Sequence, residues 1–463
     1  MPTDDFAAAR EPLQIIPGHD AYDSLDDLAL YPNPERGSER LNPFARVGHT
    51  PRFSIDHSDK VYAMGSCFAR EIEKALSAAG LDVLSLEPRR TGEGLRHQHV
   101  VNNYNPIALR QDLEIALEGR DDWAEGFAVN IDAKERRWAN YALGGGDSLK
   151  TGSREEVLAA HRRVLDAHRR IPECRMVVVT LGLVEVWFDK LTGRHLNIAP
   201  HRPAVRLHEG RFELHVMSFG QVLSELHRIR ELLKKHAKVE QNIVLTVSPV
   251  PLHATFRGQD VLQANAYSKA VLRAAAETFV LEAPDVTYFP SFEFVSLTDR
   301  TRAFGSRDYR HVNQEMVDVI MDSTLRSYVS DLPPTKVEAQ NLLKQRRYDE
   351  LTDSLFAVET GGGNVPTFLR YYGGLALQKV GRIDEAARQL RVVVEAMPQH
   401  FAARVSLAGI HLENGEREDA EAVLREVPSD FQRADAVREA LSKAASGPSA
   451  GTGPKHETFA QAS

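Results

Sequence analysis

Short apolar runs, separated by segments long enough to be helices, constrain the fold of this chain most strongly. Two of them, MVVVTL at 176–181 and NIVLTVS at 242–248, are continuous and rich in β-branched residues. This pattern is typical of strands buried on both faces. Further strand-like runs lie at 61–64, 82–86 and 286–290. Strands that alternate with helical segments predict βαβ units, and therefore an α/β fold with a largely parallel sheet and helices on both faces.

Helical patterns occupy the segments between these runs. Apolar residues recur at helical spacing over 69–79, and Gly80 follows as a predicted C-terminal cap. Ser218 and Gln221 match a capping box at the start of an amphipathic pattern over 221–235. In a parallel sheet, chemistry gathers at the carboxyl ends of the strands. The residues that directly follow each apolar run are therefore the first candidates for a functional site.

Composition and charge exclude several classes of protein. Of 463 residues, 42% are hydrophobic and 26% are charged, which excludes a mainly disordered chain and is enough for a sizeable core. The net charge of −8 gives the protein no general attraction to nucleic acid or to anionic lipid. We therefore expect no nucleic-acid partner.

The cysteines and the apolar stretches indicate the compartment. Cys67 and Cys174 are too few for a disulfide framework and lack the spacing of a zinc site, which is compatible with a reducing environment. The longest apolar stretch, 176–187, contains Thr180 and Glu185 and is too short to span a bilayer. The N-terminal sequence MPTDDFAAAREP has no apolar core and does not match a secretory signal. We expect a cytoplasmic protein without a membrane span.

From about residue 335 onward the chain is helical in pattern and contains a repeat. The segment KVGRIDEAARQL matches ENGEREDAEAVL, with Gly381 aligned to Gly415 and Ala386 to Ala420, 34 residues apart. A weaker copy, KQRRYDELTDSL, lies upstream. A 34-residue period with Gly in the turn and Ala in the second helix resembles tetratricopeptide repeats, which bind peptide segments of partner proteins. The alternative is a helical bundle with chance similarity.

These patterns divide the chain into four parts. Residues 1–40 are rich in Pro, Asp, Arg and Gly and predict an irregular N-terminal arm. Residues 41–330 form the α/β domain, which we expect to be catalytic. Residues 335–440 form the all-helical repeat domain. The Gly-, Ser- and Pro-rich tail at 441–463 is predicted to be disordered.

A serine follows the first apolar run of the α/β domain. Ser66 stands between Gly65, which allows a tight turn, and the helical pattern that begins at 69. A serine at such a junction can present its hydroxyl above the sheet, with its own N–H near a helix N-terminus, where partial positive charge favours an oxyanion. A Gly-Ser pair after a strand is more often a simple helix cap, so this signal alone is weak.

An aspartate and a histidine follow the last apolar run. Asp308 precedes His311 by three residues, a spacing that lets the carboxylate hold one ring nitrogen of the imidazole. The other ring nitrogen can then act as general base toward a nucleophile. The alternative interpretation is a surface ion pair or a cap. A serine far upstream, with Asp and His adjacent near the end of the domain, is one known order for a catalytic triad.

Several stretches resemble one protein family. The run MGSCFAREIEKAL contains the five letters that name the GSCFA family. Stretches that also resemble the family are NNYNP, TLGLVEVW, SPVPL, YFPSFE and DYRHVN, and the resemblance covers roughly residues 40–325. The family is distantly similar to SGNH (GDSL-type) hydrolases, which are flavodoxin-like α/β/α domains that cleave or transfer acyl esters.

The resemblance implies a triad at this domain. Ser66 is implied as nucleophile, His311 as base and Asp308 as the group that orients the base. In SGNH enzymes the oxyanion donors are the Ser N–H, a Gly after the next central strand and an Asn nearby. Gly182 stands at that glycine position, but Val184 occupies the Asn position and cannot donate from its side chain. The usual oxyanion hole is therefore in doubt, with Gly65 and Gly182 as backbone candidates.

Other residues near the strand ends have two interpretations each. Asn105 can replace the missing amide donor, or it can be a turn residue before Pro106. Glu185 can bind a polar substrate or adjust the histidine, or it can be a satisfied loop carboxylate. Trp187 can stack on a sugar ring, although a core aromatic is the more common role.

Three further features are assigned no chemistry. Cys67 is the stronger nucleophile by type, but a free cysteine at the start of a helix is usually buried, so we favour Ser66. His97 and His99 lack a third metal ligand at a suitable spacing. The glycine runs at 144–146 and 361–363 do not link a strand to a helix, so they predict loops rather than phosphate sites. We expect no metal and no cofactor.

Two functions follow from these residues. The first is an SGNH-like serine esterase or O-acyltransferase that works through an acyl-enzyme. Its expected substrate is an acyl ester of a saccharide or polysaccharide precursor, by analogy with the superfamily. The second is a catalytically degenerate SGNH-like scaffold whose tetratricopeptide-like domain binds a protein partner. The retained Ser, Asp and His favour the enzyme, and the missing Asn favours the scaffold.

Overall fold

The structure is a computed structural model of the chain. It describes residues 13–445 except 37, 92–93, 100–101, 135, 145–150, 306–307, 331, 333 and 361–364. The glycine runs at 144–146 and 361–363 and the C-terminal tail lie wholly or largely outside the described residues. The chain forms two compact units, and apart from the short stretch Ala78–Gly80 the division falls between Ser330 and Asp331.

A five-stranded parallel sheet forms the centre of the first unit and confirms the predicted α/β fold. The strand order is β12-β11-β7-β1-β2, and every neighbouring pair is parallel. The strands are β1 (Lys60–Gly65), β2 (Asp82–Val83), β7 (Met176–Leu181), β11 (Asn242–Val247) and β12 (Val286–Tyr288). All five coincide with the apolar runs of the sequence. Counted along the chain, the order is that of flavodoxin-like sheets.

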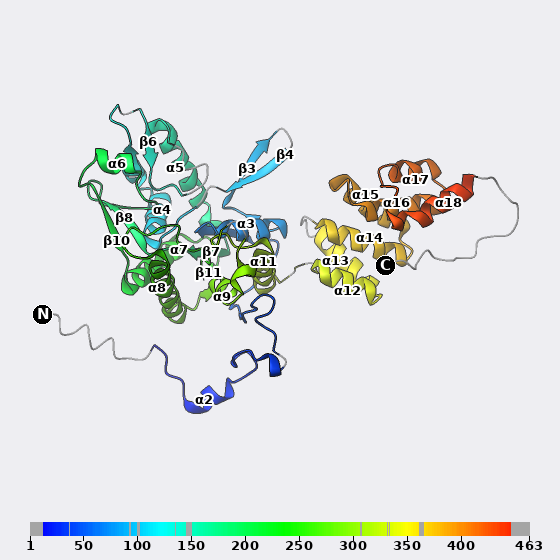
Figure 1. Cartoon of the computed structure of the whole chain (residues 1–463), viewed down its shortest axis with the longest axis horizontal. Helices are drawn as coiled ribbons and strands as arrows, with labels where there is room; N and C mark the ends of the chain where they lie inside the picture. Colours follow the sequence, from blue (N-terminus) through cyan, green and yellow to red (C-terminus); the bar gives the residue numbers. More distant parts are fainter. Residues whose placement is uncertain are drawn as a thin grey trace. The chain divides into compact units, whose positions relative to one another are not determined.

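Helices cover both faces of this sheet (Figure 1). On one face, apolar residues of alternate strand positions pack against α4 (Pro106–Glu118), α5 (Arg154–His168), α7 (Phe219–His236) and α8 (Val261–Glu282). The other face carries α3 (Ala69–Ala78), α9 (Ser291–Ser296) and α11 (Gln314–Tyr328). The capping box predicted for Ser218 and Gln221 is present at the start of α7.

Short strands outside the central sheet were not predicted. They form a three-stranded sheet, β10-β8-β9, and two hairpins, β3-β4 and β5-β6. The bounds are β3 (Leu86–Thr91), β4 (Gly94–His99), β5 (Ala128–Asn130), β6 (Trp138–Asn140), β8 (Glu185–Asp189), β9 (Arg194–Leu196) and β10 (Phe212–Val216). The remaining helices of this unit are α2 (Gly18–Asp23), α6 (Arg202–Leu207) and α10 (Arg300–Ala303), with 3-10 turns at Pro34–Arg36, Asp121–Phe127 and Ile171–Glu173.

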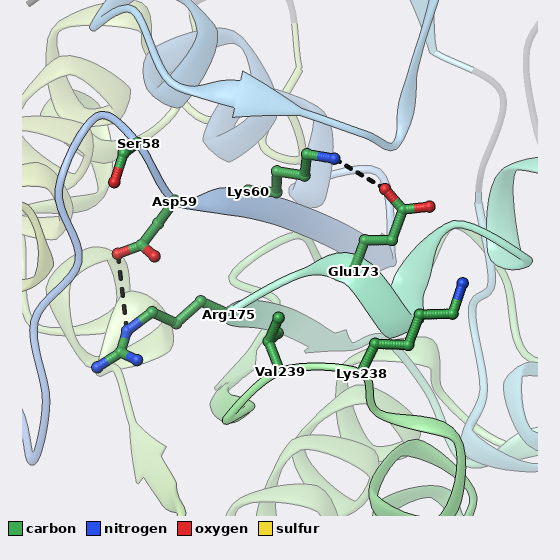
Figure 2. Close-up of a pocket in the computed structure, with 7 residues that line it drawn as sticks. All are labelled: Ser58, Asp59, Lys60, Glu173, Arg175, Lys238 and Val239. Carbon is green, nitrogen blue, oxygen red and sulfur yellow. Dashed lines mark hydrogen bonds and ion pairs between the residues drawn. The ribbon is translucent and has the colours of Figure 1, made fainter.

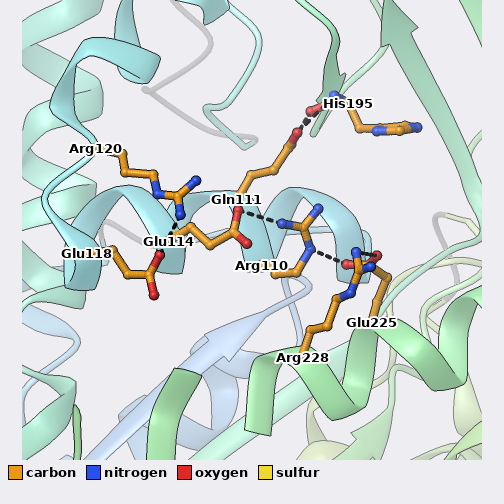
Figure 3. A network of polar contacts seen from close by, with 8 residues as sticks. All are labelled: Arg110, Gln111, Glu114, Glu118, Arg120, His195, Glu225 and Arg228. Carbon is orange, nitrogen blue, oxygen red and sulfur yellow. Dashed lines mark hydrogen bonds and ion pairs between the residues drawn. The ribbon is translucent and has the colours of Figure 1, made fainter. Parts of the chain in front are cut away.

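A polar network fixes α4 between α7 and the three-stranded sheet (Figure 3). Arg110 of α4 forms ion pairs with Glu114 on the same helix and with Glu225 of α7. Gln111 exchanges hydrogen bonds with the backbone of His195 in β9, at 2.7 and 3.1 Å. These contacts are largely buried, so they hold the start of α4 and the segment before it against the sheet.

The N-terminal segment is hydrogen-bonded to the helical layer that contains α9 and α11. The backbone N–H of Ala45 donates to the Thr298 hydroxyl at 2.9 Å, and that of Ile55 donates to the carbonyl of Tyr328 at 2.7 Å. Before these contacts, α2 buries none of its residues. No helix among the described residues is long and apolar enough to cross a membrane.

The second unit is entirely helical where it is described. Its helices are α12 (Lys336–Lys344), α13 (Tyr348–Thr360), α14 (Thr367–Lys379), α15 (Ile383–Ala396), α16 (Phe401–Glu413), α17 (Arg417–Leu424) and α18 (Asp435–Ala445), with a 3-10 turn at Gln432–Ala434. Apolar residues of α12–α16 share one core. This arrangement agrees with stacked helical hairpins.

The repeat is visible in the backbone of the turns. Gly381 and Gly415 have positive φ angles of 82° and 80°, and Arg346 occupies the equivalent position of the weaker first copy with a φ of 60°. One turn later, Leu351, Ala386 and Ala420 are all fully buried. In the first copy Arg346 and Leu351 stand where the other two copies have glycine and alanine, although the left-handed backbone of the turn is the same.

Candidate active site

The sheet topology marks one place on the first unit for a site. From β1 the chain continues to β2 on one side, whereas β7 lies on the other side of β1. In open parallel sheets, ligands bind outside the carboxyl ends of the strands where the strand order reverses in this way. The residues that follow β1 and β7, Ser66 and Gly182, therefore lie at the switch point.

Gly65 shapes the turn that presents Ser66. Its φ is +111°, a backbone conformation that residues with a side chain rarely adopt. A methyl group built on Gly65 would lie 2.1 Å from the carbonyl oxygen of Thr180 on β7. The turn therefore requires glycine for two independent reasons, and it places Ser66 against β7 before α3 begins at Ala69.

Thr180 engages Ser66 through three hydrogen bonds. The N–H of Ser66 donates to the Thr180 carbonyl at 2.9 Å, and the two hydroxyls lie 3.1 Å apart. The Thr180 hydroxyl also donates to the Ser66 carbonyl at 3.4 Å. Ser66 is buried, at 2% exposure. The Ser66 N–H, which the resemblance implies as an oxyanion donor, is thus occupied by a backbone carbonyl in this structure.

Gly182 lies directly beside Ser66. A methyl group built on Gly182 would lie 3.3 Å from Cβ of Ser66 and 2.6 Å from the carbonyl oxygen of Tyr104. The next peptide is fixed, because Leu183 donates its N–H to the same Tyr104 carbonyl at 3.0 Å. Val184 is fully buried in the core. The close approach of Gly182 to Ser66 and to Tyr104 therefore leaves no room for a larger residue at this position.

Asn105 is occupied as a helix cap. Its side-chain carbonyl accepts the N–H of Ala108 at 2.8 Å in the first turn of α4, and its amide donates to the carbonyl of Leu196 at 3.2 Å. Both ends of the side chain bind backbone groups, and the residue is 3% exposed. Of the two interpretations of Asn105, these contacts favour the turn residue over the replacement donor.

Asp308 and His311 form a dyad. Oδ2 of Asp308 lies 2.6 Å from Nδ1 of His311, while Oδ1 accepts the backbone N–H groups of Arg310 and His311 at 3.0 and 2.8 Å. The N–H donors of His311 and Arg310, together with the imidazole, lower the pKa of Asp308 to about 2. The carboxylate is thus ionised and fixed, and Nε2 of His311 has no hydrogen-bond partner among the described residues.

The dyad and Ser66 are not in contact: Ser66 is 2% exposed, whereas the side chain of His311 is 76% exposed. No hydrogen bond joins Ser66 to His311, although both residues are described. Arg310, adjacent to His311, acts electrostatically on Cys67, the residue after Ser66. Its guanidinium also donates to the carbonyl of Pro251 at 3.4 Å. This contact ties residues 308–311, which we call the dyad loop, to the segment after β11. The loop therefore lies over the carboxyl end of the sheet.

Comparison with protein families gives a match over most of the first unit. Residues 60–323 match the model of the GSCFA family, which is more than half of the chain. The chain belongs to the GSCFA family. Ser66, Gly182, Asp308 and His311 all lie inside the matched segment. Residues 377–444 match the tetratricopeptide repeat, which confirms the resemblance seen in the 34-residue period. A search of curated proteins found no match.

Cys67 of the GSCFA signature is a thiol rather than a thiolate. Burial raises its pKa, and the opposing charges of Arg70, Lys269 and Arg310 do not compensate. Since the thiolate is the reactive form of cysteine, these surroundings disfavour Cys67 as the nucleophile.

Glu185 and Trp187 of the GSCFA unit both hold the loop at 255–256. Glu185 accepts the hydroxyl of Thr255 at 2.6 Å and the N–H of Phe256 at 3.2 Å. The Trp187 ring packs edge-on against Phe256, with the ring centroids 5.2 Å apart. Their contacts favour the structural interpretation that the sequence left open for both.

Two residues at the site were not found from the sequence. Thr180 belongs to a strand that reads as a purely apolar run, so its contact with Ser66 left no signal. Lys269 of α8 did leave one, because it lies on the helix face that buries Ala264, Leu272 and Ala276. A lysine in a buried helical stripe is rare and indicates a specific role.

Metal-binding potential in the described residues is confined to one group in the second unit. Ligand atoms of His411, Glu416 and Asp419 lie within 4.8 Å of one another, but both carboxylates are exposed and His411 is already paired with Glu416 at 2.6 Å. The side chains of His97 and His99 lie outside the described residues. We assign no metal to the GSCFA unit.

A surface depression of about 430 Å³ lies at the opposite edge of the central sheet (Figure 2). Its lining comes from residues that begin or precede β1, β7 and β11. Lys60 pairs with Glu173 at 2.8 Å and Arg175 with Asp59 at 3.6 Å, so most of its charges are compensated. It lies at the amino ends of the strands, away from Ser66, and we assign it no function.

Proposed function

We propose that the GSCFA unit is a serine esterase or O-acyltransferase that works through an acyl-enzyme. One observation carries the proposal: at the switch point of the sheet, a turn that only glycine allows places Ser66 beside Gly182, and the last loop supplies a fixed Asp308–His311 pair. A nucleophile, a base and an orienting carboxylate are the parts that acyl transfer requires.

The reaction follows from these roles. The Ser66 oxygen attacks the acyl carbonyl while Nε2 of His311 takes the hydroxyl proton, and Asp308 stabilises the imidazolium that forms. The tetrahedral intermediate collapses, the leaving alcohol receives that proton from His311, and the acyl group remains on Ser66. Water in an esterase, or an acceptor hydroxyl in a transferase, then attacks the ester by the same route in reverse.

The Gly182 N–H is the proposed donor to the oxyanion. Gly182 packs against Ser66, whereas the Ser66 N–H and the Asn105 amide are engaged elsewhere. For Ser66 to donate its own N–H as well, the turn must release the Thr180 carbonyl when substrate binds. Catalytic hydrogen bonds that form only in the complex are common in ligand-free enzymes.

The proposed substrate is an acyl ester of a saccharide or polysaccharide precursor. The resemblance to SGNH hydrolases supports this class. The proposed compartment is the cytoplasm.

Pre-steady-state hydrolysis of a small aryl acetate tests the proposal. The wild type should release a burst of the phenol, and Ser66→Ala and His311→Gln should abolish it. Cys67→Ala is the matched control, because it alters the neighbouring residue and should retain the burst. A burst that survives in Ser66→Ala would overturn the assignment of the nucleophile.

A protein-binding scaffold is the second candidate function. Two observations favour it: the Ser66 hydroxyl is bonded to Thr180 rather than to His311, and residues 377–444 match a repeat that binds proteins. On this account Ser66→Ala would leave the binding of a protein partner unchanged.

A further inference from the structure

Lys269 is buried at the centre of the site. Its side chain extends from α8 and is 2% exposed. The ammonium donates to the carbonyl of Gly182 at 2.9 Å and to that of Ser248 at 2.7 Å. These two carbonyls belong to the residues that directly follow β7 and β11. One side chain thus ties together the carboxyl ends of two central strands.

No carboxylate neutralises this ammonium. None of the ion pairs in the described part of the chain includes Lys269, and its partners are neutral carbonyls. Burial lowers the pKa of Lys269 to about 7. Removing an ammonium from water without a counter-ion is costly, and the fold could hold the same strand ends with a neutral amide. Unpaired buried charges of this kind gather at functional sites.

The charge lies within electrostatic range of the proposed nucleophile turn. Lys269 and Cys67 act on each other, and Cys67 directly follows Ser66. The Gly182 carbonyl that Lys269 binds belongs to the residue whose added methyl group would lie 3.3 Å from Cβ of Ser66. Negative charge that develops beside Ser66 therefore develops near an uncompensated cation.

We propose that Lys269 is a positioning residue that supplies the positive potential of this site and holds Gly182 as the oxyanion donor. This role rests on the proposed function. It gives one reason for two unusual features. These are the valine at 184, where SGNH enzymes have an amide donor, and the lysine in the buried stripe of α8. A cation in a dry site stabilises a developing oxyanion more strongly than it would in water.

The potential can be measured without any acyl chemistry, through Cys67. The charges that act on its thiol are Arg70 from α3, Lys269 from α8 and Arg310 from the dyad loop. The rate of Cys67 alkylation by iodoacetamide, followed against pH by peptide mass mapping, reports the fraction of the thiol that is ionised at each pH. The other cysteine, Cys174, is fully buried and its pKa is raised to about 12, so it does not compete in the folded protein.

Two neutral variants separate charge from hydrogen bonding. Lys269→Met removes both, whereas Lys269→Gln keeps an amide that can donate to the two carbonyls. At pH 6, where Lys269 carries its charge, both should slow Cys67 alkylation roughly tenfold relative to the wild type, and the difference should disappear above pH 8, where Lys269 has lost its proton. Lys234→Met, at an exposed lysine of α7, is the matched control and should alkylate at the wild-type rate at both pH values. A wild-type rate in Lys269→Gln at pH 6, with the protein folded by circular dichroism, would overturn the proposed potential.

The second readout is phosphonylation of Ser66 by a fluorophosphonate. Lys269→Gln should slow it at least about tenfold, since the oxyanion-like adduct loses its cation. Labelling at the wild-type rate would reduce Lys269 to a structural tie and overturn its electrostatic role. Failure of the wild type to label Ser66 would count against the esterase proposal, while the rate of Cys67 alkylation at pH 6 would still decide whether Lys269 sets the potential.

Discussion

The hydroxyl of Ser66 lies 3.1 Å from the hydroxyl of Thr180 on the neighbouring strand, and it forms no hydrogen bond with the imidazole of His311. With the Ser66 N–H also donated to the Thr180 carbonyl, the serine is held by β7 on both of its polar groups. An acyl step therefore requires Ser66 to exchange Thr180 for His311. On the proposed mechanism, this exchange requires the buried Ser66 side chain to rotate and the exposed His311 to approach it.

Gly65→Ala tests the turn that presents Ser66. The added methyl group meets the Thr180 carbonyl oxygen at 2.1 Å, and φ is +111°. We expect a loss of about 3 kcal/mol or more in the free energy of unfolding, measured by urea denaturation. Gly210→Ala is the control, because its φ is +74° with nothing within 4 Å. It should lose only about 1 kcal/mol. Equal losses would contradict the close approach to β7.

Substitution of Asn105 by alanine or serine distinguishes its role as a helix cap from a role as an oxyanion donor. The side chain caps α4, so its removal should lower the free energy of unfolding by about 1 kcal/mol. Asn105→Ser restores a capping oxygen and should recover most of that loss. Neither variant should change the rate of Ser66 labelling at a pH where both are folded. A labelling defect in Asn105→Ser comparable to that of Ser66→Ala would show that Asn105 takes part in the reaction.

Asp308→Asn should slow Ser66 labelling by roughly 10²–10⁴-fold, because the imidazolium loses its partner. Asp299→Asn, at a carboxylate that caps α10, is the matched control and should label normally. The pKa of Asp308, lowered to about 2, also predicts a pH effect on folding. Its stabilising contribution is present above pH 4 and is lost as the pH falls toward 2. Full labelling by Asp308→Asn would show that the dyad is not a catalytic pair.

His168 gives the fold a dependence on mild acid. It is fully buried against the Tyr62 hydroxyl, and burial lowers its pKa from 6.5 to about 4. Between these values the unfolded chain binds a proton that the folded protein does not, so stability falls as the pH falls. His168 should contribute about 2 kcal/mol of that loss between pH 7 and pH 5.

Urea denaturation at the two pH values checks this, with His168→Gln expected to flatten the dependence. His49 and His195 act in the same direction, since burial lowers both of their pKa values to about 4. His253→Gln, at an exposed histidine, is the control. An unchanged slope in His168→Gln would contradict the neutral state of His168.

Two glycines of the second unit, one in a turn and one inside a helix, should respond in opposite ways to substitution by alanine. Gly381→Ala should cost about 1 kcal/mol, because its φ of +82° strains any residue with a side chain. Gly409→Ala lies inside α16 with open space around it and should stabilise the protein by about 0.5–1 kcal/mol. Both are measured by thermal denaturation. Equal effects would contradict the turn geometry of the repeat.

The sequence was most informative where burial is complete. Strands β7 and β11 have apolar residues on both faces, so their runs match the observed bounds closely. The three-stranded sheet was missed because β8, EVWFD, alternates only in part, β9 is only three residues long, and β10 follows β8 after more than twenty residues. Such pairing is decided by tertiary contacts, which periodicity does not record.

The candidate site could likewise be predicted from the sequence only in part. The places of Ser66 and Gly182 follow from strand ends, and the contact of Asp308 with His311 follows from a spacing of three residues. The capture of Ser66 by Thr180 depends on how closely two strands approach at a strained glycine. The burial of Lys269 depends on which face of α8 meets the sheet. Both are consequences of packing rather than of local sequence.

Covalent labelling by a fluorophosphonate, mapped to a residue by mass spectrometry, tests the central claim most directly. The account predicts one adduct on the wild type, located on Ser66, retained in Cys67→Ala and lost in His311→Gln. An adduct on another residue, or labelling of Ser66 that His311→Gln leaves unchanged, would contradict a Ser66–His311–Asp308 triad.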